Sequence, residues 1–88
     1  MIEKQHRNAR SFPLSMALEG DRVRIVRHRG GEGLDKRLAS MGLHIDSTME
    51  ILQRIGGSFV VAVNDLRLAL GTGMAHKIIV EPLSLEIY

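Results

Sequence analysis

The sequence contains no cysteine and no tryptophan, and only three of its 88 residues are aromatic. Without cysteine, the chain can form neither disulfides nor thiolate metal sites. So few aromatic side chains argue against the aromatic-walled grooves that bind proline-rich peptides, and against base stacking on single-stranded nucleic acid. The longest unbroken apolar run, residues 59–63, is far shorter than the roughly 20 residues of a membrane-spanning helix, and no apolar stretch follows residues 1–11 as a signal peptide would require. We therefore expect a cytoplasmic protein with no direct membrane insertion.

Positive charge is concentrated near the N-terminus. The formal net charge is only +2, but residues 1–29 hold seven Lys or Arg against three Asp or Glu. Four of the arginines lie on or directly after the first predicted strand: Arg22, Arg24, Arg27 and Arg29. Such charges most often form a solvated surface. The alternative is that they bind nucleic-acid phosphates, which requires only charge, so a nucleic-acid-binding barrel or a metal-responsive regulator is a second hypothesis.

The apolar pattern predicts an all-β fold, a small five-stranded barrel with one short inserted α-helix. Residues 1–11 lack periodicity and are predicted to be a flexible N-terminal arm, residues 12–82 the folded domain, and residues 83–88 a C-terminal extension. Apolar residues at helical spacing predict a helix at 33–41. Alternating apolar residues, with tight turns at Gly56-Gly57 and Asn64-Asp65, predict strands at 22–28, 48–55, 58–63, 66–70 and 77–80. In the extension, alternating Leu83, Leu85 and Ile87 would suit an edge strand, within the chain or between copies in a homo-oligomer.

The predicted helix has a clear end. Leu34, Leu38 and Met41 are spaced at i, i+4 and i+7 and form one apolar stripe. Gly42 follows where a helix often ends with a residue of left-handed conformation, and Leu43 is placed to fold back on Leu38. This pattern predicts a Schellman motif at the C-terminal end of the helix.

The strands have one irregularity and a predicted inner face. Val23 and Ile25 point inward, but strict alternation would then bring Arg27 to the same side, so we expect a bulge near Val26. Further inward-facing residues are predicted in the next two strands: Met49, Ile51 and Ile55, and Phe59, Val61 and Val63.

Several motifs occur in a fixed order along the chain. They are a segment at 14–21 that ends in Gly-Asp, an Arg/Val/Ile strand, a glycine-rich loop, Arg-Leu-Ala-Ser-Met-Gly-Leu at 37–43, a Gly-Gly hairpin, Leu-Arg-Leu-Ala-Leu at 66–70, and Ala75 before Ile-Ile-Val. Over about residues 14–81 this set resembles the ferrous iron transport protein A (FeoA) family. The resemblance implies an SH3-like barrel that acts as a cytoplasmic accessory of the membrane ferrous iron transporter FeoB, binding its cytoplasmic part and modulating transport. It implies no catalysis by this chain.

One turn departs from the family pattern. Members commonly carry glycine in the turn before the second strand, where this chain has His44-Ile45-Asp46. Aspartate tolerates left-handed geometry better than most residues, so we expect the turn to be retained.

No catalytic, cofactor or metal motif is visible. The glycine-rich loop at 29–33 lacks the Gly-Lys-Ser/Thr ending of a phosphate-binding loop, so we predict no nucleotide binding. The four histidines, at positions 6, 28, 44 and 76, have neither helical i, i+4 nor strand i, i+2 spacing. A ferrous site from His44, Asp46 and Glu50 would require these three side chains to converge. We predict no catalytic residue, no specific metal site and no cofactor.

The helix and the residues after it are the candidate partner-binding site. The four residues selected are Leu34, Arg37, Met41 and Leu43. A charged side chain beside an apolar stripe is typical of a protein interface. The alternative is that the stripe belongs to the core and covers the outer face of the strand at 58–63, where Val60 and Ala62 point away from the barrel interior.

Overall fold

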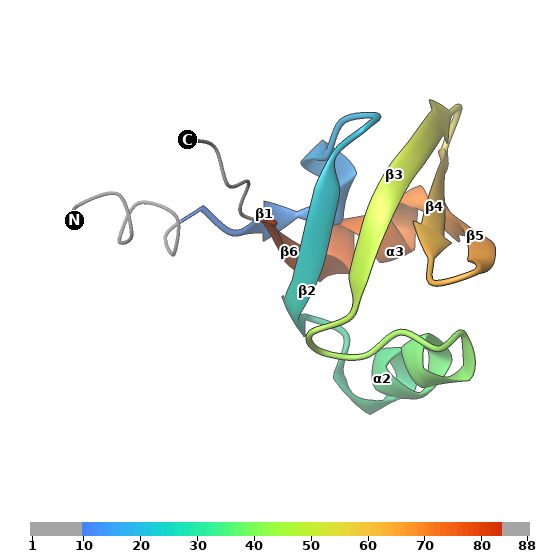
Figure 1. Ribbon diagram of the computed structural model, residues 1–88. Helices are drawn as coiled ribbons and strands as arrows, with labels where there is room; N and C mark the ends of the chain where they lie inside the picture. Colours follow the sequence, from blue (N-terminus) through green and yellow to red (C-terminus); the bar gives the residue numbers. More distant parts are fainter. Residues whose placement is uncertain (1–9, 84–88) are drawn as a thin grey trace.

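The structure, a computed structural model, describes residues 10–83 (Figure 1). Along the chain its elements are β1 (Phe12–Pro13), the 3-10 helix η1 (Leu14–Met16), β2 (Arg22–His28), α2 (Gly31–Ser40), β3 (Thr48–Ile55), β4 (Ser58–Val63), β5 (Leu66–Gly71), α3 (Thr72–Lys77) and β6 (Ile78–Pro82). The strands form one antiparallel sheet in the order β1-β6-β2-β3-β4-β5. The predicted arm (1–11) and extension (83–88) lie almost entirely outside the described residues.

The predicted all-β class, with a helix inserted after the first long strand, is confirmed. The five predicted strands and the helix begin and end within two residues of their expected positions. Two elements go beyond the prediction. The strand β1 has only two residues, one of them proline, and so carries no alternation. The helix α3 has six residues and lies between the strands predicted at 66–70 and 77–80.

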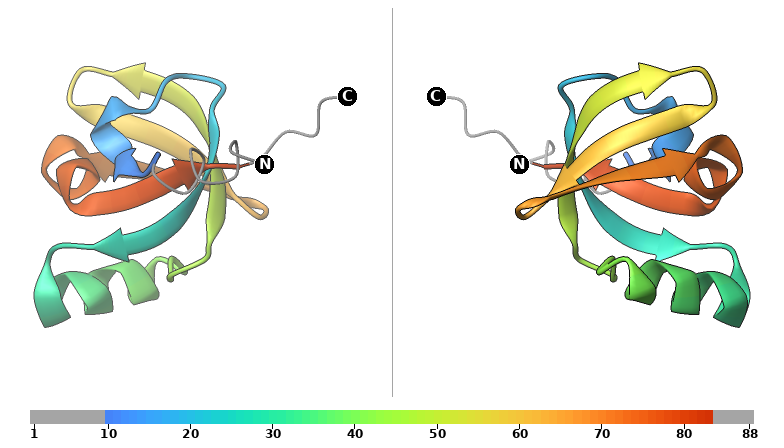
Figure 2. Two further views of the ribbon diagram at one scale, coloured as in Figure 1. Left: turned by 90° about the vertical axis from the view of Figure 1, so that its left-hand side faces the viewer. Right: turned by 90° about the vertical axis from the view of Figure 1, so that its right-hand side faces the viewer.

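The sheet curls but does not close. The strands β1 and β5 are at its two ends, and each pairs on one side only within the described residues (Figure 2). The helix α3 contacts η1 and β1 and so bridges the gap between the two ends. The predicted closed five-stranded barrel is therefore a six-stranded, partly open one.

Two bulges set the curvature of the sheet. The register between β2 and β6 shifts between Ile25 and Arg27, as predicted. A second shift, between Ile51 and Gln53 in β3, is not predicted by the sequence. It reverses the alternation, so Arg54 lies opposite Phe59, with its guanidinium 5.1 Å from the ring centroid. The expectation that Ile55 faces inward is therefore wrong: its side chain is 59% exposed.

The core is wholly apolar among the described residues. The inward faces of the curled sheet meet Leu14 and Ala17 from the η1 segment, Leu38 and Leu43 from the α2 segment, and Ala75 from α3. No polar or charged side chain in residues 10–83 is buried. The short elements between the strands therefore complete a core that the open sheet cannot enclose alone.

The end of α2 has the predicted Schellman geometry. Gly42 has a φ of 81°, its N–H donates to the Ala39 carbonyl at 2.9 Å, and the Leu43 N–H donates to the Leu38 carbonyl at 2.8 Å. Leu38 and Leu43 are both buried. Asp46, also as expected, adopts a left-handed φ of 79°.

The helix lies at one end of the barrel, next to β2 (Figure 1). The alternative in which its stripe covers the outer face of β4 is not what the structure shows, because Val60 and Ala62 stay half-buried on a face that α2 does not reach. The stripe instead joins the core through Leu38, with Leu34 and Met41 packed at its margin.

Replacing Gly42 by valine should lower the free energy of unfolding by about 1–2 kcal/mol or more, because an L side chain is strained in the left-handed region. A Cβ at position 42 would meet no atom within 4 Å, so the loss would come from the backbone conformation and not from a clash. Gly33→Ala is the matched control: Gly33 lies inside α2 without a positive φ and with open space around it. It should raise stability by about 0.5–1 kcal/mol. Urea unfolding measures both, and equal effects would contradict the assigned helix end.

Replacing Leu38 by alanine should cost about 2–5 kcal/mol, because this side chain is 2% exposed and links α2 to the core. Thermal and urea unfolding followed by circular dichroism would measure the loss. A melt that Leu38→Ala leaves unchanged would mean that α2 is not part of the cooperative fold.

Candidate protein-interaction site

The open side of the sheet exposes apolar side chains that belong to the inner face. In β5, Leu66, Leu68 and Leu70 lie opposite the buried residues Val63, Val61 and Phe59 of β4 and therefore point inward. Their burial nevertheless decreases along the strand: Leu70 is 1% exposed, Leu68 is half-buried and Leu66 is 57% exposed. The inner face of the sheet is therefore progressively more exposed to solvent toward the β4–β5 turn.

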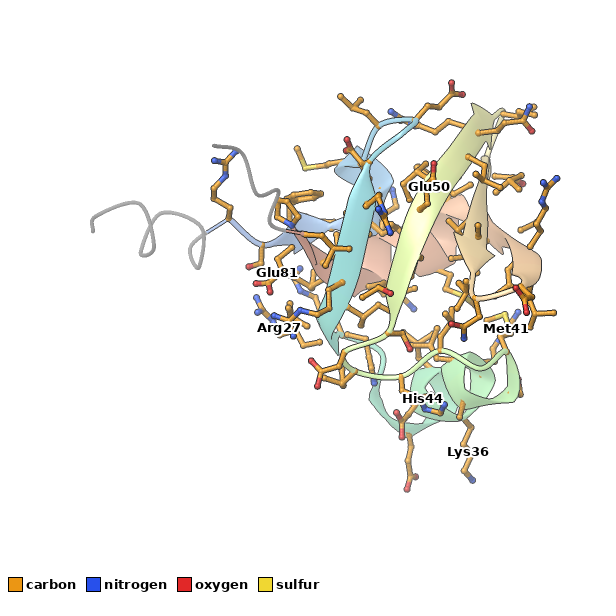
Figure 3. All side chains as sticks on the ribbon, viewed as in Figure 1. Arg27, Lys36, Met41, His44, Glu50 and Glu81 are labelled. Atoms are coloured by element: carbon orange, nitrogen blue, oxygen red, sulfur yellow. The ribbon has the colours of Figure 1, made fainter. Side chains whose placement is uncertain are left out.

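Further half-buried residues border the same opening. Three of them pack against the margin of the core and stay partly exposed: Leu34 on α2, Met41 at the C-terminal end of α2, and Met74 on α3. Figure 3 shows Met41 on the side of the β4–β5 turn. We call these apolar residues the seam: Leu34, Met41, Leu66, Leu68 and Met74.

A groove of about 340 Å³ runs between α2 and α3 at one end of the seam. Its lining residues are Gly30, Leu34 and Arg37 on the α2 side, and Gly71, Gly73, Met74 and Lys77 on the α3 side. The large apolar side chains of the lining are Leu34 and Met74, and its charged residues are the two cations Arg37 and Lys77. Neither cation is in an ion pair within the described residues. The groove therefore suits a ligand that is both apolar and acidic.

Local contacts hold the two walls of the groove in place. The Arg29 N–H donates to the Lys77 carbonyl at 2.9 Å, which ties the loop before α2 to the end of α3. The Gly30 N–H lies 3.4 Å from His28 Nδ1, and His28 Nε2 lies 3.3 Å from an Asp35 carboxylate oxygen. If Nδ1 accepts, Nε2 carries the proton and donates to Asp35. The His28 imidazole thus joins the α2 wall of the groove to β2.

Glycine is required at position 30. A Cβ there would come within 2.3 Å of the Leu34 Cβ, so any other residue would displace the Leu34 side chain from the groove wall. Gly71 and Gly73 on the opposite wall have open space around them and keep that wall low.

One arginine of β2, Arg24, is committed to the fold by ion pairs. Arg24 donates from one guanidinium nitrogen to Asp46 at 2.5 Å and from the other to Glu81, and so joins β2 to β6 and to the turn before β3. The hydrogen bond to Glu81 is the main cause that raises the pKa of Arg24, and burial opposes it. Arg22 lies opposite Glu50 in the ladder. One of the four arginines is therefore neutralised by carboxylates and a second has a glutamate opposite it in the ladder, which weakens the case for a nucleic-acid surface on this strand.

No metal site forms within residues 10–83. No three or more His, Asp or Glu side chains gather there, so His44, Asp46 and Glu50 do not converge. His28 contacts Asp35, and His76 Nδ1 lies 3.0 Å from Ser15 Oγ. His6 lies outside the described residues. None of the helices in this part of the chain is long and apolar enough to cross a membrane.

The predicted partner-binding residues are only partly together. Leu34 and Arg37 line the groove, and Met41 lies in the seam. Leu43 is 1% exposed, so its side chain belongs to the core and offers no surface to a partner. The opposite side of the opening comes from β5 and α3, through Leu66, Leu68, Met74 and Lys77. Sequence reasoning missed it because the position of β5 at the end of the sheet depends on strand order.

Comparison with known proteins identifies the family and the fold. The family model of the FeoA domain matches residues 12–82. An Fe²⁺ transport protein A of Methanocaldococcus jannaschii is 34% identical over 70 residues, covering 80% of this chain and 85% of that protein. A crystal structure of an iron uptake regulatory protein (FeoA) has a TM-score of 0.77 at 33% identity, covering 83% of this chain and 97% of that one.

The same barrel occurs inside larger proteins. A manganese-dependent transcriptional repressor has a TM-score of 0.76 at 26% identity, with 83% of this chain matching 42% of the repressor. The FeoA structure, in contrast, is matched over 97% of its own length, and this match confirms the SH3-like architecture expected from the motifs. The chain belongs to the FeoA family of ferrous iron transport accessory proteins.

Proposed function

We propose that this chain is a cytoplasmic accessory protein of ferrous iron uptake that binds the cytoplasmic part of a FeoB-type membrane transporter and modulates transport. Membership of the FeoA family supports a role in ferrous iron uptake. The observation that supports binding is the groove between α2 and α3, which is lined by the apolar Leu34 and Met74 and by the basic Arg37 and Lys77. Apolar surface rimmed by charge is the composition of a protein-interaction site.

Each part of this surface has a distinct physical role. Burying the half-exposed leucine and methionine side chains against a partner removes apolar area from water, at about 25 cal/mol per Å². The two cations attract acidic side chains, which increases the association rate and selects the partner. Because the hydrogen bonds of Arg29 and His28 already fix the walls, binding requires little ordering of the chain.

The direct test is isothermal titration calorimetry, in which this chain is titrated into the purified cytoplasmic part of the transporter with and without guanine nucleotide. Saturable one-to-one binding supports the proposal. Absence of binding under every nucleotide condition would refute it.

Arg37→Glu should weaken binding of the transporter domain about five- to tenfold, because it puts a negative charge on the rim of a groove that favours acidic ligands. The melting temperature should stay nearly unchanged, since Arg37 is exposed and in no ion pair within the described residues, and such a side chain contributes little to folding. Lys36→Glu is the matched control. It makes the same charge change on the same helix, but Figure 3 shows Lys36 pointing away from the barrel.

Equal losses in the two variants would indicate a general charge effect and not docking at the groove. Loss of binding on deletion of residues 1–11, with no effect of Arg37→Glu, would place the interface elsewhere on the molecule.

The isolated chain should hydrolyse neither GTP nor ATP, because it acts through binding alone. It should also bind ferrous iron no more tightly than separate imidazoles do, since no three ligands converge within the described residues. A phosphate-release assay and anaerobic calorimetry measure these two properties. A one-to-one ferrous site of micromolar affinity that is lost in His44→Ala would contradict the second expectation.

A further inference from the structure

The two ends of the sheet differ in how they are protected. A strand at the end of a sheet presents unpaired N–H and C=O groups, and proteins protect such edges by shortness, proline, charge or a bulge. The strand β1 has two of these devices, since it is two residues long and contains Pro13. The strand β5 has six residues, no proline and one charged residue, Arg67, and its register with β4 is unbroken from Leu66 to Gly71. It is a long, regular edge beside the seam.

The turn before β5 determines which backbone groups point outward. Asn64 and Asp65 form a two-residue turn, with Asn64 at a φ of 56°, and Val63 and Leu66 close the ladder. In such a hairpin the closing pair exchanges hydrogen bonds, and every second pair after it does the same. Leu66, Leu68 and Leu70 therefore bond to β4. The N–H and C=O groups of Arg67 and Ala69 point to the free edge.

We infer that the partner enters as an extended segment that adds a strand to β5. Its main chain pairs with the outward N–H and C=O groups of Arg67 and Ala69. Side chains of an added strand point to the same faces as those of its neighbour, so every second side chain lies over the seam beside Leu66 and Leu68. The side chains between them lie on the outer face beside Arg67. This inference rests on the proposed function for the identity of the partner.

The faces of β5 specify the chemistry of that segment. Residues over the seam are apolar, because they complete a core margin formed by Leu34, Met41, Leu66, Leu68 and Met74. Residues between them are acidic, because they lie on the outer face beside the basic Arg67. The same charge disfavours a second copy of this chain, which would bring its own Arg67 to the shared edge. The ligand is thus an extended segment in which apolar and acidic residues alternate.

Backbone amide hydrogen exchange tests the pairing directly. Two probes are used: the cytoplasmic part of the transporter, and a capped hexapeptide of alternating valine and glutamate. In the free chain the amides of Leu66, Leu68 and Leu70 should exchange slowly and those of Arg67 and Ala69 quickly. Saturation with either probe should slow exchange at Arg67 and Ala69 about tenfold or more, as one new hydrogen bond each would require. The other three should change little, because they are already bonded.

A pair of variants at one position tests the same contact by affinity. Ala69→Pro removes an outward N–H, and proline is tolerated on an edge strand when its nitrogen faces solvent. Ala69→Val keeps the N–H and changes only an exposed side chain. The proline variant should bind the transporter domain about tenfold more weakly, and the valine variant as the original does. Circular dichroism checks that both variants fold. If the proline variant does not fold, the amide exchange of the original chain still tests whether a strand is added to β5.

The outcomes separate this inference from the proposed function. If the transporter domain binds but Arg67 and Ala69 still exchange quickly, strand addition is wrong and the proposed function stands. If the peptide protects both amides and the transporter domain does not bind, the docking edge stands and the proposed partner is wrong. Slow exchange at both amides in the free chain, with a dimer by light scattering, would assign the edge to a second copy and overturn the inference.

Discussion

The unpaired edge of β5 is the constraint on which the rest of the molecule depends. A curled sheet that closed on itself would bury Leu66 and Leu68 as fully as Leu70, but within residues 10–83 the last strand has a neighbour on one side only. The short helices cover what the sheet leaves open: α3 bridges to η1 and β1, and α2 lies over one end next to β2 (Figures 1 and 2). These helices do not cover the inner face of the sheet near the β4–β5 turn. The seam is thus a consequence of the strand order and of the length of the helices.

The contacts around α2 show why this opening can be a binding site and not a defect. A helix of ten residues is marginal in isolation, so its position depends on tertiary contacts. Leu38 anchors it in the core, the Schellman motif at Gly42 ends it, and His28 joins its first turns to β2. The apolar margin formed by Leu34 and Met41 is therefore held in place before any ligand arrives. A preformed apolar surface costs less ordering on binding than a flexible one.

Local rules in the sequence predict much of this fold. Gly42 after an apolar stripe predicts the helix end, Arg27 out of phase with Ile25 predicts the first bulge, and both are confirmed. The bulge in β3 leaves no such signal, because an apolar Ile55 fits a strand pattern on either face. The candidate site divides in the same way. Leu34 and Arg37 are found from helical spacing, whereas the β5 side depends on which strand ends the sheet, and that is decided by pairings between residues far apart in the chain.

The basic residues are divided between folding and recognition. Arg24 is directly opposite Glu81 and also reaches Asp46, so its charge is used to join three segments of the domain. Arg37 and Lys77, at the groove, have no such partner among the described residues. A transcriptional repressor contains the same barrel, so the fold alone does not determine function. The features that we propose for recognition lie at the opening of the barrel. In this chain those are an apolar seam, two basic side chains and a strand edge whose backbone groups point outward.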